Sequence, residues 1–103
     1  MTKKELIKLT EQICKGWKMD MPQVEIRSSH IMNNIAGLAF FPRKSTDDFK
    51  PIIVFNAKVL YNETFDYIIN VLFHELAHIY TQKGDNDIEF INFCKHNHIW
   101  LNE

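Results

Sequence analysis

The chain lacks the features of a disulfide-stabilised or membrane-bound protein. Its 103 residues include only two cysteines, three glycines and three prolines. Cys14 and Cys94 form no CxxC pair and are too few for a disulfide framework, so we expect a reducing compartment. No apolar run is long enough for a signal peptide or a membrane span. We therefore expect a cytoplasmic protein with no membrane partner.

An excess of charge of one sign is also absent. Twelve Lys and Arg residues face thirteen Asp and Glu residues, which gives a formal net charge of −1. No global basic field points to a nucleic-acid partner. The lysines near the N-terminus are predicted to form the solvated face of a helix; they are Lys3, Lys4, Lys8, Lys15 and Lys18.

What the sequence does contain is the composition of a folded protein. It is 46% hydrophobic and 13% aromatic, and its length suits one domain over residues 1–103. Apolar residues at helical spacing predict a first helix over residues 3–18, which the Met21–Pro22 step ends. Three short stretches then have strand character, at residues 24–28, 35–42 and 51–56. The polar stretch 43–50 is expected to be a surface loop.

From Phe65 onward the apolar residues follow the period of an amphipathic helix. Asn62 is a suitable N-cap for this helix and Gly84 a suitable stop. A last helix is predicted over residues 87–98. The order of helix, three strands, helix and helix predicts an α+β fold.

The most informative stretch is HELAH, residues 74–78, on the long predicted helix. A spacing of four places the imidazoles of His74 and His78 on one helix face, where they can share a metal ion. Two imidazoles suit Zn²⁺ and leave room for a third ligand and a water, whose pKa the metal lowers. Glu75 could then accept the proton of that water and pass it to a leaving amine. The motif predicts zinc-dependent peptide hydrolysis; the alternative is a metal-free helix with incidental histidines.

The third zinc ligand must come from beyond this helix. Residues of suitable chemistry downstream are Asp85, Asp87, Glu89, His96 and His98. Glu89 and His96 would share one face of the last helix, but they stand about 10 Å apart along it and do not suit the same ion. Spacing alone leaves the choice open.

Four stretches together resemble the SprT-like (Spartan-type) zinc metalloprotease domain: "VEIRSS", "IAGLAFF", "PIIVFNAKVL" and "VLFHELAHIY…EFINFCKHNHIWLN". The resemblance spans nearly the whole chain. It implies a minimal zincin, with an N-terminal helix, a three-stranded sheet, an HExxH active-site helix and a C-terminal helix, acting on a protein substrate. In that family a histidine ligand precedes a phenylalanine by four residues, and aligning "FCKHNH" places Glu89 at the ligand position. The implied zinc set is His74, His78 and Glu89, with Glu75 as the catalytic residue.

The chain departs from this family in three respects, one of which is that the segment before the implied third ligand is a few residues shorter. The implied third ligand is a glutamate rather than a histidine, although a His₂Glu set is also used by catalytic zinc sites. The zinc-ribbon cysteines of the bacterial SprT pattern are absent, so we expect weak, salt-sensitive DNA binding at most.

A second family offers a competing interpretation. "PIIVFN", HExxH and "DIEFINFC" are similar to the ImmA/IrrE-like peptidases, which cleave repressors, and this resemblance also implies Glu89 as a ligand. A non-catalytic domain that uses zinc for stability, or to bind a partner, is the third interpretation. The sequence indicates neither the natural substrate nor the oligomeric state.

Overall fold

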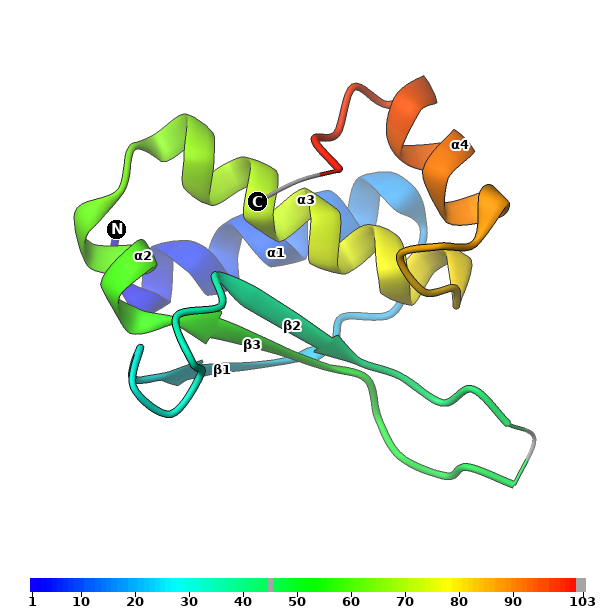
Figure 1. Ribbon diagram of the computed structural model, residues 1–103, viewed down its shortest axis with the longest axis horizontal. Helices are drawn as coiled ribbons and strands as arrows, with labels where there is room; N and C mark the ends of the chain where they lie inside the picture. The colour runs from blue at the N-terminus through cyan, green and yellow to red at the C-terminus, as the bar shows by residue number, and fades with distance from the viewer. Residues whose placement is uncertain (45, 102–103) are drawn as a thin grey trace.

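The computed structural model describes residues 1–44 and 46–101 (Figure 1). Within these residues four helices accompany a three-stranded mixed sheet, so the fold is α+β, as predicted. The elements in chain order are α1 (Lys3–Trp17), β1 (Gln23–Arg27), β2 (Gly37–Phe40), β3 (Ile52–Asn56), α2 (Ala57–Asn62), α3 (Phe65–Thr81) and α4 (Ile88–His96).

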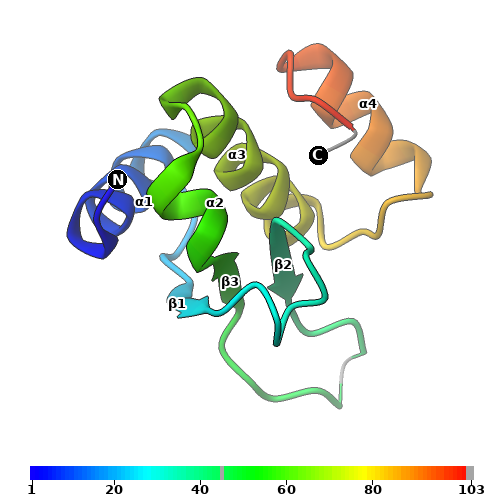
Figure 2. The same cartoon turned by 60° about the vertical axis from the view of Figure 1, so that its left-hand side comes forward.

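The sheet has the order β1-β3-β2, with the last strand in the sequence at its centre. Strand β1 pairs with β3 in parallel, and β2 pairs with β3 antiparallel. Helices α1 and α3 lie on one face of the sheet, while the connection from β2 to β3 extends away from the body of the molecule (Figures 1 and 2). Strand β2 is therefore an edge strand, and it runs beside α3, which carries HELAH.

Two groups of buried apolar residues hold these layers together. The larger group joins α1, the sheet and α3, and its fully buried members include Leu6, Ile53, Phe55, Leu72 and Leu76. The smaller group lies between α3, α4 and the chain that follows α4, and its members are Ala77, Phe90, Cys94 and Ile99. Helix α3 is thus buried on two sides, which sequence periodicity alone did not predict. Among the described residues, no helix is long and apolar enough to cross a bilayer.

The limits of α3 differ from the predicted ones. Residues 57–62 form the separate short helix α2, whose N-cap is Asn56. Thr64, not Asn62, caps α3, and its hydroxyl accepts a hydrogen bond from the N–H of Tyr67. The helix ends at Thr81 because Gln82 takes the left-handed conformation, with φ of 57°, that Gly84 was expected to supply.

Helix α4 is shorter than the predicted helix over residues 87–98. Asp87 is its N-cap, and Asn97 follows its last residue, His96. His98 has a φ of 58°, which turns the chain back toward α3. This reversal brings the following residues against the face of α3 that carries the histidines.

Candidate metal centre

Both histidines of HELAH are buried. His74 is 5% exposed and His78 is 8% exposed. The ring of Phe90, from α4, stacks on His78 with centroids 3.9 Å apart and planes 2° from parallel, and it meets His74 edge-on at 5.2 Å. At about 100° per residue, the two histidines fall outside the main apolar arc of α3. Their burial follows because α4 and the chain after it form a second apolar group over that face.

Backbone carbonyls fix the tautomers of the two rings. Nδ1 of His74 lies 2.9 Å from the carbonyl oxygen of Trp100, and Nδ1 of His78 lies 2.8 Å from that of Lys83. A carbonyl oxygen can only accept, so each Nδ1 carries a hydrogen and donates it. In each neutral ring the Nε2 atom then keeps its lone pair, which is the arrangement found in metal-ligating histidines.

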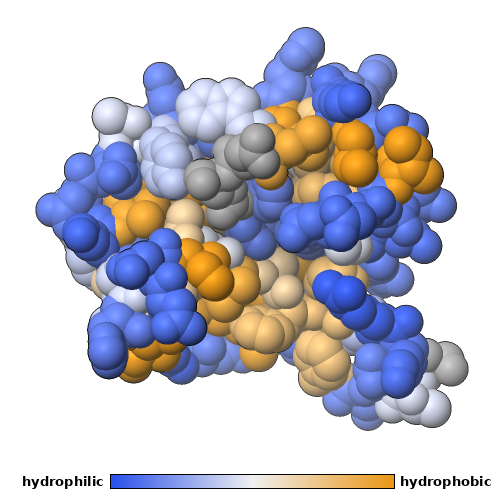
Figure 3. Space-filling view, viewed as in Figure 1, coloured by the Kyte–Doolittle hydropathy of each residue, from blue (hydrophilic) through white to orange (hydrophobic). Residues whose placement is uncertain are grey.

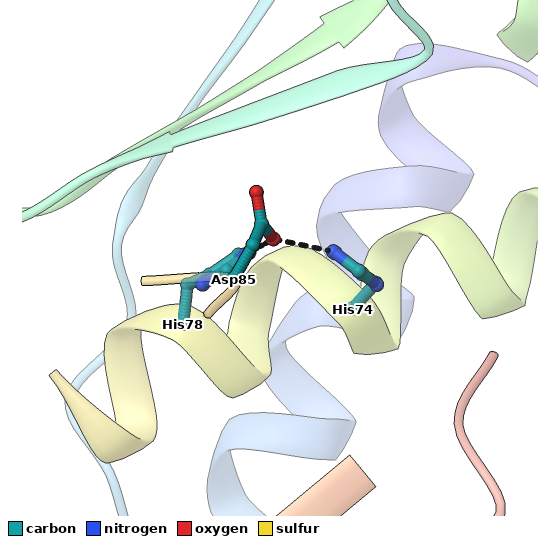
Figure 4. Close-up of side chains that lie close together, drawn as sticks. All are labelled: His74, His78 and Asp85. Atoms are coloured by element: carbon teal, nitrogen blue, oxygen red, sulfur yellow. Dashed lines mark ion pairs between the residues drawn. The ribbon is translucent and has the colours of Figure 1, made fainter. Parts of the chain in front are cut away.

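The third member of the cluster is the carboxylate of Asp85 (Figure 4). Its Oδ1 lies 2.9 Å from Nε2 of His78 and 3.5 Å from Nε2 of His74. With neutral rings, three lone-pair donors converge with no hydrogen between them, which is repulsive unless a cation lies among them. In a tetrahedral site with ligand distances of about 2.0–2.1 Å, ligand atoms stand about 3.3 Å apart. The donor types and their separations therefore fit Zn²⁺.

Glu89, the ligand that both resemblances implied, lies outside this cluster. The N-cap Asp87 accepts a hydrogen bond from the N–H of Glu89 at 2.9 Å, which fixes the start of α4. That register turns Phe90 toward the histidines, and Glu89, about 100° further round the helix, is exposed. Among the described residues the cluster consists of His74, His78 and Asp85 alone. Asp85, one of the candidates that spacing left open, lies in the cluster, while Glu89, Asp87, His96 and His98 lie outside it.

A cleft of about 670 Å³ opens beside the cluster. Its walls come from β2, α3, the loop after α3, and α4, and its lining includes Gly37, Leu38, Ala39, Phe41, Arg43, His74, Glu75, His78, Asp85 and Phe90. Glu75 is 4% exposed and lies in this lining between the two histidines in sequence. Apolar side chains gather around the middle of this face of the molecule (Figure 3). The cleft thus combines an apolar wall with one buried carboxylate and a set of side chains that could hold a metal ion.

Gly37 is a site residue whose importance could not be read from spacing. A Cβ at this position would stand 3.0 Å from Cγ1 of Val71 and 3.1 Å from Cγ of Glu75. Its lack of a side chain lets the edge strand β2 approach α3 where Glu75 faces the cleft. In the sequence, Gly37 was only part of the Ala-Gly strand of the family resemblance, and its contact with Glu75 depends on tertiary structure.

We expect Gly37→Ala to destabilise the protein by about 1–3 kcal/mol, because the added methyl overpacks a filled contact. Glu75 should also be displaced, lowering any hydrolytic rate more than zinc affinity. Gly16→Ala is the matched control, since a Cβ there meets no atom within 4 Å, and alanine should stabilise helix α1 by up to about 1 kcal/mol. Denaturant unfolding of both variants measures the difference; equal stabilities would contradict the close approach of β2.

Cys94 takes no part in this chemistry as a thiolate. Its side chain is fully buried in the smaller apolar group. Burial raises the pKa of the Cys94 thiol to about 11, and the nearby Asp85 carboxylate adds to the rise. The thiol therefore stays protonated near neutral pH, and Cys94 packs as a small buried hydrophobe.

Comparison with known proteins adds to this geometry. The family model of the SprT-like family matches residues 3–102. The chain therefore belongs to the SprT-like family, and the first of the two resemblances is confirmed. Membership suggests a metalloprotease-like domain. No curated protein and no solved structure matches the chain.

Proposed function

We propose that this chain is a zinc-dependent peptidase that holds the metal with His74, His78 and Asp85 and uses Glu75 as general base. One observation carries the proposal: three lone-pair donors converge, within 4.8 Å of one another, at a cleft that Glu75 also lines. A structural zinc site is closed by four protein ligands. Three ligands beside an open cleft favour a catalytic site instead.

In this proposal some residues bind the metal and Glu75 transfers the proton. When bound, zinc supplies Lewis acidity, lowering the pKa of water and polarising a carbonyl oxygen. Glu75 accepts the proton of the attacking water and delivers it to the amine that leaves. The close contact of Gly37 with Glu75 limits the positions that the carboxylate can take. The ring of Phe90 excludes water from one side of the histidines.

The substrate would be a polypeptide in extended conformation. Strand β2 is an edge of the sheet and lines the cleft with Gly37, Leu38 and Ala39. An extended chain laid along this edge could pair with the backbone of β2, and its side chains could use the apolar wall. This pairing would hold the scissile peptide bond near Glu75.

Cleavage of a labelled, unfolded polypeptide tests the proposal. We expect hydrolysis by the zinc-loaded protein, loss of hydrolysis after chelation, and recovery on return of one equivalent of zinc. A protein that binds zinc but cleaves none of a broad set of unfolded polypeptides would favour the non-catalytic interpretation. A folded protein that takes up no zinc would refute the metal site as well.

A further inference from the structure

The chain after α4 is attached to the metal centre through the backbone of one residue. His98 reverses the chain, and the N–H of Ile99 then donates to the carbonyl of Cys94 at 2.8 Å. Ile99 is 6% exposed and packs with Ala77 and Phe90 between α3 and α4. Residues 98–101, the C-terminal segment, thus begin with a turn and a buried anchor that direct Trp100 onto α3.

Two side chains of α3 form hydrogen bonds with the backbone N–H and the backbone carbonyl of Trp100. The N–H of Trp100 donates to Oδ1 of Asn70 at 3.0 Å, and its carbonyl accepts from Nδ1 of His74 at 2.9 Å. Asn70 and His74 are four residues apart, so they lie one above the other on the same face of the helix. The side chain of Trp100 is itself about half exposed. The two hydrogen bonds to α3 are therefore made by the backbone of Trp100 and not by its indole ring.

The two histidines differ in how their carbonyl partners are placed. Lys83, the partner of His78, is five residues further along the chain and is positioned by the end of α3. Trp100, the partner of His74, is 26 residues away in sequence. Its carbonyl reaches His74 only if the C-terminal segment docks in register. The carbonyl partner of His74 therefore needs a further contact to position it, whereas the carbonyl partner of His78 does not.

Asn70 has the properties of a residue that positions the carbonyl of Trp100. It is 8% exposed, and its Nδ2 has no hydrogen-bond partner among the described residues. Burying an amide with an unsatisfied donor is unfavourable, so packing alone gives no reason for asparagine here. The bond that its side chain does make is the one to Trp100. That bond also identifies Oδ1, because only the oxygen of the amide can accept from an N–H.

We propose that Asn70 is a positioning residue of the metal centre, acting on His74 through the backbone of Trp100. The inference rests on the metal site of the proposed function. Asn70 holds the Trp100 carbonyl where Nδ1–H of His74 donates to it, so Nε2 of His74 keeps its lone pair toward Asp85. By linkage, zinc binding and docking of the C-terminal segment stabilise each other.

Asn70→Leu and Asn70→Asp provide the test. Leucine removes the acceptor, and we expect zinc affinity, measured by competition with a chelator, to fall 10- to 100-fold. Aspartate keeps an acceptor at the same place and should stay within a few fold of the parent. Thr10→Val controls for lost stability, since it removes another buried hydrogen bond, from Thr10 Oγ1 to the Leu6 carbonyl, on α1. Equal zinc affinity in the leucine variant and the parent, or an aspartate variant as weak as leucine, would overturn the proposal.

Nitrogen NMR of the metal-free protein gives a readout that needs no activity. With neutral rings, His74 should show the Nδ1–H tautomer in the parent and a tautomer mixture in Asn70→Leu, while His78 keeps Nδ1–H in both. An unchanged His74 tautomer would overturn the positioning role even if the peptidase assay succeeds. A parent that binds no zinc would instead refute the proposed function, with the tautomers still reporting on Asn70.

A second pair of variants covers the case in which Asn70→Leu does not fold. Trp100→Pro deletes the backbone N–H that donates to Asn70, whereas Trp100→Ala keeps that N–H and removes only the half-exposed ring. We expect the proline variant to lose zinc affinity by the same 10- to 100-fold and the alanine variant to match the parent. Equal affinities for the two would show that the backbone bond does not serve His74.

Discussion

Glu75→Gln is expected to abolish most peptide hydrolysis while leaving zinc bound. Glutamine has nearly the same volume as glutamate but cannot accept a proton, and loss of a general base typically costs 10²- to 10⁴-fold in rate. The fold should be unchanged, because glutamine keeps the aliphatic part of the side chain, whose Cγ lies close to the backbone of Gly37. Initial rates on an unfolded polypeptide, with zinc content measured on the same samples, test this expectation.

The control for this variant separates the base from the metal. His78→Ala should lose both zinc and activity, since His78 contributes one of the three donors. If Glu75→Gln hydrolysed the substrate at the parent rate with zinc in place, Glu75 would not be the base. If it lost zinc as well, the carboxylate would have a role in binding that the proposal does not include.

Asp85→Ala is expected to weaken zinc binding by at least about 100-fold, above the usual effect of a residue that acts through a ligand. Glu89→Ala is the matched variant, because it removes the same charge from the same part of the chain. Its affinity should stay within a few fold of the parent, since Glu89 is exposed and outside the cluster. Chelator competition at one ionic strength compares the two; a larger loss in Glu89→Ala would restore the ligand that the resemblance implied.

Helix α3, which carries HELAH, was predictable because it is governed by local physics. Its apolar period begins at Phe65, and that residue is the first of α3. The spacing within HELAH brings His74 and His78 together in any α-helix, whatever the rest of the chain does. The three strands were found for the same reason, since β1 alternates apolar and polar residues, and β2 and β3 are short apolar runs bounded by glycine or proline. Their order, with β3 in the middle, depends on pairing between distant segments and was not predicted.

The place of Asp85 beside the two histidines could not be predicted, because it depends on a loop. Asp85 reaches the histidines because Gln82 turns the chain directly after α3, in a conformation usually taken by glycine. Glu89 was the ligand that both family resemblances implied, and in the SprT-like family the segment before that ligand is a few residues longer than in this chain.

The hydrogen-bond partners of the two histidine Nδ1 atoms could not be predicted from the sequence either. They are backbone carbonyls, of Trp100 and Lys83, and a carbonyl has no sequence signature. Asn70 gives a weak signal, as a polar residue in an apolar stretch of helix four residues before His74. That signal becomes informative only when the C-terminal segment is seen docked beside it.

The metal position in crystals of the zinc-loaded protein tests the central claim most directly. Anomalous scattering at the zinc edge should show a single site per chain, about 2.0–2.2 Å from Nε2 of His74, Nε2 of His78 and an oxygen of Asp85. A fourth position should open toward the cleft and Glu75. A zinc ion bound by Glu89 in place of Asp85, or one that avoids the two histidines, would contradict the account.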